Sequence, residues 1–182
     1  VIEVFSEASI AFMAFILVSS SVYLMNDMID YKKDKLHPDK MKRPIASDRI
    51  SRRLAASVMF VLFALGLGLS FFLPHKFIIV LLVYFLIQIF YSIILKRVVL
   101  LDVFIISIGF VLRIIAGGVA ANVYISSWIL LCTFLGALFL ALAKRRNELV
   151  VLDDEAVTHR ETLQEYSEDL LTQLISIVAG AT

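Results

Sequence analysis

The chain has 182 residues, of which 60% are hydrophobic, and its mean hydropathy is +0.91. Soluble domains contain roughly 45–50% apolar residues, so this composition excludes an ordinary soluble domain. A formal net charge of +1 indicates no particular class of partner, and the single cysteine excludes an internal disulfide framework and a cysteine-based metal site. Cys132 lies in an apolar stretch and is predicted to be a small core residue.

Five apolar segments are each long enough to cross a bilayer as an α-helix. In chain order they are residues 8–25, 54–73, 77–95, 99–121 and 126–143. They lack the two-residue alternation of a transmembrane barrel. A sixth apolar run begins near Leu170, and the chain starts without Met, so both ends of a longer protein are expected to be missing. The sequence therefore predicts an all-α, polytopic transmembrane helix bundle, with residues 1–182 as a single transmembrane domain.

Charged residues are concentrated in two polar segments. Residues 31–53 hold nine Lys and Arg and the stretch after Ala143 holds four, whereas residues 122–127 hold none. The positive-inside rule then predicts that segments 31–53 and 144–169 are cytoplasmic loops. Thirteen of the sixteen Asp and Glu residues also lie between 27 and 48 or between 148 and 169. Because the rule requires only basic residues, the mixed charge indicates a polar site on the cytoplasmic side.

The first polar segment opens with Asn26-Asp27-x-x-Asp30-x-x-x-Asp34, where an apolar helix leaves the membrane. At 100° per residue, the three carboxylates fall within an arc of about 60° on one helix face. Stacked carboxylates repel one another and need a cation, and oxygen ligands of this kind suit Mg²⁺ together with substrate phosphates. We therefore predict that Asp27, Asp30 and Asp34 are catalytic residues and metal ligands. The alternative is a solvated helix end whose aspartates pair with neighbouring lysines.

Two further features carry positive charge. Lys42 and Arg43 precede a rigid turn at Pro44 and could contact phosphate oxygens, although membrane topology explains them equally well. Arg113 is the only charge deep inside an apolar segment and is predicted to line an interior cavity, the alternative being a structural ion pair. Asp102 lies about 16 Å away along the same helix and cannot pair with it directly.

The motif of residues 26–34, followed by Lys42-Arg43-Pro44-Ile45-Ala46, resembles the first signature of the UbiA-type intramembrane prenyltransferase superfamily. The resemblance covers nearly the whole chain. It implies a bundle of about nine transmembrane helices around a central cavity, of which this chain would hold the second to the start of the seventh. It also implies Mg²⁺ held by two Asp-rich loops that bind a prenyl diphosphate.

The second loop departs from that pattern. Where most of the superfamily has another Asp-x-x-x-Asp, this chain reads Lys144-Arg145-Arg146-Asn147-Glu148. The cationic loop is similar to the decaprenyl-phosphate phosphoribosyltransferase branch, as are Leu112-Arg113-x-x-Ala116-Gly117-Gly118 and Arg160-x-x-Leu163-x-x-Tyr166. A phosphoribosyl donor brings a 5-phosphate besides its diphosphate, and a polyprenyl phosphate adds another anion. Lys and Arg side chains bind such anions directly through charge-assisted hydrogen bonds.

The expected substrate-binding residues combine these motifs with a Tyr and a Lys near the third apolar segment. They are Asn26, Lys42, Arg43, Tyr91, Lys96, Arg113, Lys144, Arg145, Glu148, Arg160 and Tyr166. The superfamily often shows Tyr-x-x-x-Lys, and the spacing from Tyr91 to Lys96 is one residue longer. An interfacial aromatic and a topology charge are equally good interpretations of that pair.

The resemblance implies a Mg²⁺-dependent membrane transferase that moves 5-phosphoribose from phosphoribosyl diphosphate to a polyprenyl phosphate and releases diphosphate. Such an enzyme would serve cell wall biosynthesis in a prokaryotic cytoplasmic membrane, with its active site on the cytoplasmic side. A prenyltransferase acting on an aromatic or lipid acceptor is the alternative among enzymes. A membrane transporter is the alternative of another class, although no inverted repeat is visible. No nucleic-acid partner is expected, and the sequence leaves the oligomeric state open.

Overall fold

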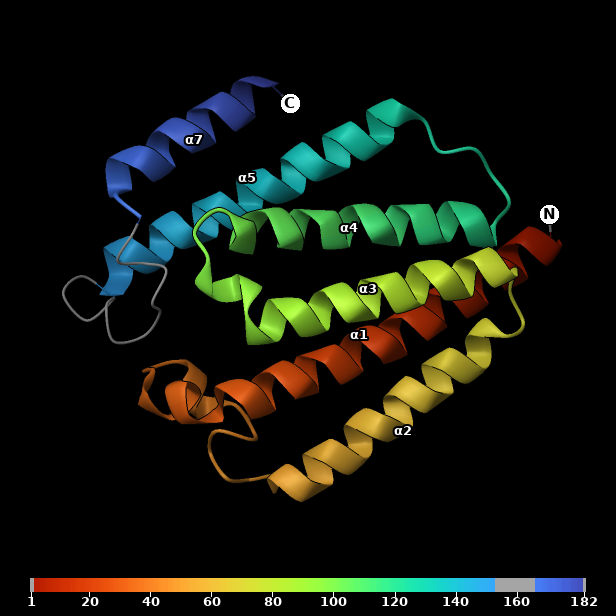
Figure 1. Cartoon of the computed structure of the whole chain (residues 1–182), viewed down its shortest axis with the longest axis horizontal. Coiled ribbons are helices and arrows are strands. Elements are labelled where there is room, and N and C mark those ends of the chain that lie inside the picture. The colour runs from red at the N-terminus through yellow and green to blue at the C-terminus, as the bar shows by residue number, and fades with distance from the viewer. Residues whose placement is uncertain (1, 153–165, 182) are drawn as a thin grey trace. The chain divides into compact units, whose positions relative to one another are not determined.

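The computed structural model describes residues 2–152 and 166–181, and these residues form only helices (Figure 1). The α-helices are α1 (Ile2–Leu36), α2 (Arg52–Ser70), α3 (His75–Ile93), α4 (Leu101–Ala120), α5 (Ser127–Leu152) and α7 (Glu168–Ala181). Two short 3-10 helices, η1 (Lys40–Lys42) and η2 (Leu95–Arg97), lie in loops. Among the described residues, five helices, α1 to α5, are long and apolar enough to cross a membrane. The predicted all-α integral membrane fold is confirmed.

Helix α1 continues past the first apolar segment without a break. It ends at Leu36, so Asp27, Asp30 and Asp34 all lie on one helix, as the spacing predicts. The next helix, α2, begins after Ser51, whose side chain caps it by accepting a hydrogen bond from the Leu54 backbone N–H. The long polar extension of α1 therefore carries the first cluster of carboxylates beyond the apolar part of the helix.

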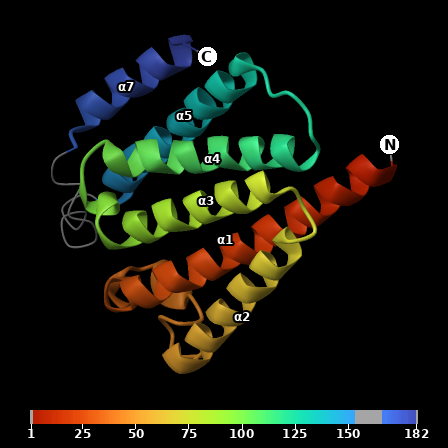
Figure 2. The same cartoon turned by 45° about the vertical axis from the view of Figure 1, so that its right-hand side comes forward.

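The chain divides into two compact units, the first consisting of Val1–Ser92 and Ile115–Tyr124. In this unit α1 lies beside both α2 and α3 (Figures 1 and 2). The ring of Phe15 on α1 lies 4.7 Å, centroid to centroid, from the ring of Tyr84 on α3. The hydroxyl oxygens of Ser19 and Tyr84 are 3.2 Å apart. These contacts hold α1 in place and so position its polar end.

At Gly66, α2 packs tightly against α1. A Cβ atom at this position would lie 2.9 Å from the Ala14 carbonyl oxygen and 2.8 Å from Val18 Cγ2. The backbone oxygen cannot move aside, so we expect Gly66→Ala to destabilise the protein by about 1–3 kcal/mol. Gly68→Ala is the matched control, since a Cβ there meets nothing within 4 Å and Ala favours helix. Thermal unfolding in detergent measures both, and equal stability of the two variants would contradict this packing.

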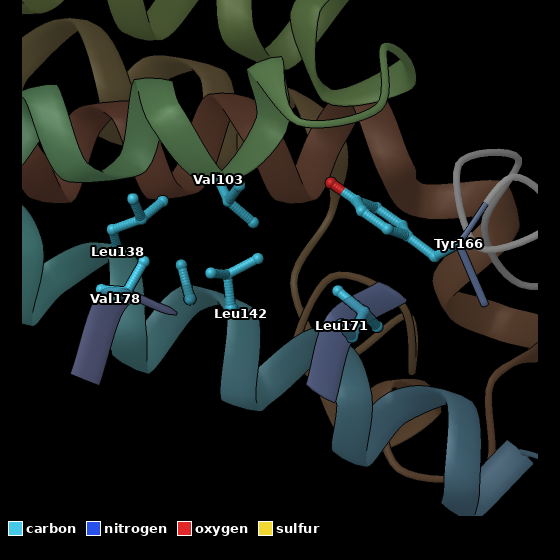
Figure 3. Packing of buried hydrophobic residues seen from close by; sticks show 7 residues of the cluster. Val103, Leu138, Leu142, Tyr166, Leu171 and Val178 are labelled. Carbon is cyan, nitrogen blue, oxygen red and sulfur yellow. The ribbon is translucent and has the colours of Figure 1, made fainter. Parts of the chain in front are cut away.

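The second unit consists of Ile93–Ile114 and Ile125–Thr182. Figure 3 shows its core, to which α4, α5, α7 and the residues before α7 contribute. The buried members are Val103, Leu138, Ala141, Leu142, Tyr166, Leu171 and Val178. One prediction is wrong here, because Cys132 on α5 is exposed rather than part of the core. An apolar environment in the sequence does not distinguish core from surface in a membrane helix, since a lipid-facing surface is apolar too.

Candidate active site

The aspartates at the polar end of α1 converge on a cation supplied by the chain itself. Nη1 of Arg43 lies 2.7 Å from Asp27 Oδ1 and 3.0 Å from Asp34 Oδ2. The Asp34 side chain is only 7% exposed and that of Asp27 is 23% exposed. Asp30 lies between them in the sequence and is partly exposed. The structure therefore brings together four residues of the predicted site, three of them carboxylates on one helix.

A compact turn directs Arg43 back toward α1. Arg43 follows η1, and its backbone N–H donates to the Lys40 carbonyl. Its own carbonyl accepts hydrogen bonds of 2.8 Å from both the N–H and the hydroxyl of Ser47. Ile45 and Ala46 are buried after Pro44. The Arg-Pro-Ile-Ala sequence thus folds as a turn with an apolar underside, which holds the arginine backbone at the end of α1.

Asp48 fastens the same loop to α1 and was not predicted from the sequence. Its carboxylate accepts a hydrogen bond of 2.6 Å from the Tyr31 hydroxyl and another from Lys35 Nζ. These hydrogen bonds, that of Lys35 foremost, lower the pKa of Asp48. Its backbone φ is 57°, a left-handed conformation that aspartate tolerates better than most residues. A signal was present in the sequence, since Asp is common where turns need that conformation.

The donor set at α1 fits a hard divalent cation. Among the residues that the structure describes, no three His, Cys, Asp or Glu side chains are arranged to hold a metal ion. Two carboxylates nevertheless share one cationic nitrogen, and Mg²⁺ commonly takes one or two carboxylates with the remaining positions filled by water and phosphate oxygens. Asp27 and Asp34 match that requirement. The role of Asp30 as a third ligand stays a prediction.

The second unit contains a buried polar network around Asp102, which is fully buried at the start of α4. Arg145 Nε lies 2.7 Å from Asp102 Oδ2, and the Tyr166 hydroxyl donates to Asp102 Oδ1 at 2.8 Å. Nη1 of Arg145 lies 2.7 Å from Glu148 Oε2, and the arginine side chain is only 3% exposed. Arg145, Glu148 and Tyr166 were each predicted from the sequence, and Asp102 joins them.

The same network holds the loop before α4. The Leu100 backbone N–H donates to the Tyr166 hydroxyl at 2.7 Å. Leu100 has a φ of 66°, which is unusual for a bulky residue and is sustained here by that bond. Burial, and then the charge of Asp102, raise the pKa of Tyr166, so its hydroxyl stays protonated and donates. In the sequence, the only basic residue on the same apolar segment as Asp102 is Arg113, and nothing in the local spacing points to the arginine on α5.

The other predicted substrate-binding residues lie on several elements. Asn26 is on α1, Tyr91 on α3, Lys96 in η2, Arg113 on α4 and Lys144 on α5, while Lys42 is an exposed residue of η1. The guanidinium of Arg113 lies 5.0 Å from the centroid of the Phe110 ring. Arg160 and the later acidic run, residues 153–155, lie outside the described residues. The substrate-binding roles of all these residues stay predictions.

The chain is similar to known proteins over nearly its whole length. Residues 3–164 match the UbiA prenyltransferase family. Decaprenyl-phosphate phosphoribosyltransferase from Mycolicibacterium smegmatis is 37% identical over 98% of this chain and 56% of that protein. The Mycobacterium tuberculosis protein of the same name is 34% identical over 99% of this chain and 60% of its own length. The chain therefore spans a little more than half the length of these relatives.

A solved structure adds the fold. The structure of a UbiA homolog from Archaeoglobus fulgidus bound to DMAPP and Mg²⁺ superimposes with a TM-score of 0.83 at 18% identity. The match covers 96% of this chain and 63% of that chain. The helical architecture, the acidic end of α1 and the matched family lead to one conclusion. The chain belongs to the UbiA prenyltransferase family.

Proposed function

We propose that this protein transfers 5-phosphoribose from phosphoribosyl diphosphate to a polyprenyl phosphate and releases diphosphate, with Mg²⁺ as cofactor. The observation that carries the proposal is the convergence of Asp27 and Asp34 on one cationic nitrogen at the polar end of α1. The relatives named decaprenyl-phosphate phosphoribosyltransferase, at 34–37% identity, support the phosphoribosyl donor. The cationic segment at Lys144 supports it too, because this donor and acceptor bring more anionic groups than a prenyl diphosphate does.

The residues of the first unit would bind and orient the donor diphosphate. Asp27 and Asp34 would hold Mg²⁺, and Lys42 and Arg43 would face phosphate oxygens. When bound, the metal supplies a positive charge that stabilises the departing diphosphate. The bond between C1 of ribose and the diphosphate oxygen breaks, and an oxygen of the polyprenyl phosphate forms the new bond to C1. That oxygen is already anionic, so the reaction needs no strong general base.

We place this site on the cytoplasmic side of a prokaryotic membrane. The basic residues that precede α2 and those at positions 144–146 of α5 support this orientation. A polyprenyl phosphate is anchored in the bilayer with its phosphate at the surface. A site at the polar end of a membrane helix would receive that lipid from the bilayer and the phosphoribosyl donor from water.

A prenyltransferase is the second candidate. The description of the matched family, UbiA prenyltransferase, supports it, and UbiA homologs from Archaeoglobus fulgidus were captured with DMAPP or with GPP, each with Mg²⁺. At 18–21% identity these structures speak for the fold alone. Offering the full-length protein in detergent either labelled phosphoribosyl diphosphate with polyprenyl phosphate or labelled prenyl diphosphate with an aromatic acceptor separates the two. We expect label in the lipid extract from the first pair only, and only with Mg²⁺.

Lys144 provides a cleaner test of the cationic segment than its buried neighbour. It is exposed on α5, whereas replacing Arg145 would also remove the guanidinium that pairs with the buried carboxylate of Asp102. Loss of one charge-assisted contact to phosphate is worth about tenfold to a hundredfold in rate, so Lys144→Ala should lower kcat/KM by that factor. Its melting temperature should not change.

Arg146→Ala is the control for Lys144→Ala. Arg146 is the next exposed cation along α5, two residues after Lys144, and it pairs with Glu168 at 3.0 Å. If Lys144 and Arg146 served only membrane topology, neither variant would change kcat/KM appreciably. Wild-type kcat/KM in Lys144→Ala would therefore remove this residue from the site.

A further inference from the structure

We infer that the Arg43 guanidinium takes the metal's place between Asp27 and Asp34 when no diphosphate is bound, so that metal and diphosphate bind as a pair. This inference rests on the proposed function for the identity of the metal and of the anion. Its physical content is an exchange of cations. The chain supplies a cation for the empty site and moves that cation to the substrate when the substrate arrives.

The geometry makes the two cations mutually exclusive. A single nitrogen, Nη1 of Arg43, is within hydrogen-bonding distance of one oxygen from each carboxylate, 2.7 Å for Asp27 and 3.0 Å for Asp34. A Mg²⁺ ion bound by those same oxygens would sit about 2.0–2.1 Å from each. It would thus occupy the space between them that the nitrogen now fills, and two positive charges at that separation repel strongly. The guanidinium must therefore withdraw before the ion can bind.

Burial explains why an internal cation is needed. The Asp34 side chain is 7% exposed, and Asp27 lies two helical turns before it on the same helix. Two partly desolvated carboxylates without a cation are costly, since burial and mutual repulsion both disfavour the charged forms. Arg43 removes that cost. A metal ion that binds alone must first displace this guanidinium. Its net binding free energy is therefore smaller than its interaction with two free carboxylates would give.

A diphosphate changes this balance by giving Arg43 a new partner. A guanidinium binds phosphate oxygens through two parallel N–H groups, so leaving the carboxylates for a diphosphate loses little. The arginine can make this move without unfolding the loop. Its side chain is 39% exposed, while its backbone stays bonded to Lys40 and Ser47 and the loop stays tied to α1 through Asp48. The metal should therefore bind tightly only in the presence of diphosphate.

The test measures metal binding directly, without turnover. Mn²⁺ replaces Mg²⁺ as the probe, and electron paramagnetic resonance reports bound Mn²⁺ for purified full-length protein in detergent, with and without inorganic diphosphate. For the wild type, we expect diphosphate to strengthen Mn²⁺ binding about tenfold or more. For Arg43→Gln, Mn²⁺ alone should bind about tenfold more tightly than it does to the wild type, and added diphosphate should change that affinity much less.

Two further variants sharpen the comparison. Arg43→Lys keeps the charge near the carboxylates, so Mn²⁺ alone should bind it about as weakly as the wild type. Arg49→Gln removes an exposed positive charge from the same loop and should also leave the affinity unchanged, which separates displacement from a general loss of charge. Thermal unfolding of each variant confirms that it is folded.

The outcomes separate this inference from the proposed function. If Mn²⁺ binds the wild type with diphosphate, and Arg43→Gln shows the wild-type affinity for Mn²⁺ alone, the exchange is wrong and the proposed metal site stands. An equal gain in Arg49→Gln and Arg43→Gln would also overturn the exchange, because net charge alone would explain it. If neither the wild type nor Arg43→Gln binds Mn²⁺ under any condition, the metal site and the exchange both fail.

Discussion

Asp27→Asn is expected to lower kcat/KM for phosphoribosyl transfer by about a hundredfold to a thousandfold at saturating Mg²⁺. The substitution removes one of the two carboxylates that converge on Arg43, and an uncharged amide attracts Mg²⁺ less strongly than a carboxylate does. The fold should remain intact, because Arg43 keeps its contact with Asp34 and the loop stays fastened through Asp48. Steady-state rates across a Mg²⁺ titration measure the effect.

Asp39→Asn is the matched control for that experiment. It makes the same chemical change close by, but Asp39 is 80% exposed and its interaction with Lys42, 3.4 Å away, is a weak surface pair. We expect its kcat/KM to stay within about twofold of the wild type. An Asp27→Asn enzyme with wild-type kinetics would show that the carboxylates on α1 do not hold the metal.

The largest effect on stability is expected at Asp102. Asp102→Ala should destabilise the protein by about 3 kcal/mol or more, because Arg145 would keep its positive charge in a buried environment without the Asp102 carboxylate. The hydrogen bond that Tyr166 donates to the carboxylate would be lost as well. Unfolding in detergent, followed by circular dichroism, measures the change.

Two comparisons isolate the cause of that loss. Glu168→Ala breaks the exposed pair with Arg146 and should cost about 1 kcal/mol or less. The double variant Asp102→Leu/Arg145→Met removes both charges and should be more stable than Asp102→Ala, since it leaves no buried guanidinium facing the position of the lost carboxylate. If Asp102→Ala and Glu168→Ala are equally stable, the ion pair at Asp102 does not stabilise the second unit.

The spans and the acidic face of α1 could be predicted because each depends on local sequence. A bilayer requires a minimum length of apolar helix, and the helical period fixes which side chains share a face. Because α1 continues to Leu36, the spacing of Asp27, Asp30 and Asp34 places them on one helix face. For these features, neighbours in the sequence determine the structure.

The partners of those residues could not be predicted, because they come from elsewhere in the chain. Arg43 meets Asp27 and Asp34 only through the turn that follows η1, which spacing along a helix does not describe. Asp102 and Arg145 are 43 positions apart and on different helices. A buried carboxylate in a membrane helix implies that a partner lies nearby, but the sequence does not identify which cation that partner is. A predicted phosphate ligand, Arg145, therefore also has a structural partner.

The chemistry of the product tests the central claim most directly. The full-length protein in detergent receives phosphoribosyl diphosphate, a prenyl diphosphate, a polyprenyl phosphate, an aromatic acceptor and Mg²⁺ in one reaction, and mass spectrometry identifies what forms. We predict a polyprenyl phosphate that carries 5-phosphoribose, one diphosphate released for each such molecule, and almost none of either from Asp27→Asn. Prenylated aromatic acceptor, with the polyprenyl phosphate unchanged and phosphoribosyl diphosphate unconsumed, would contradict the proposed reaction.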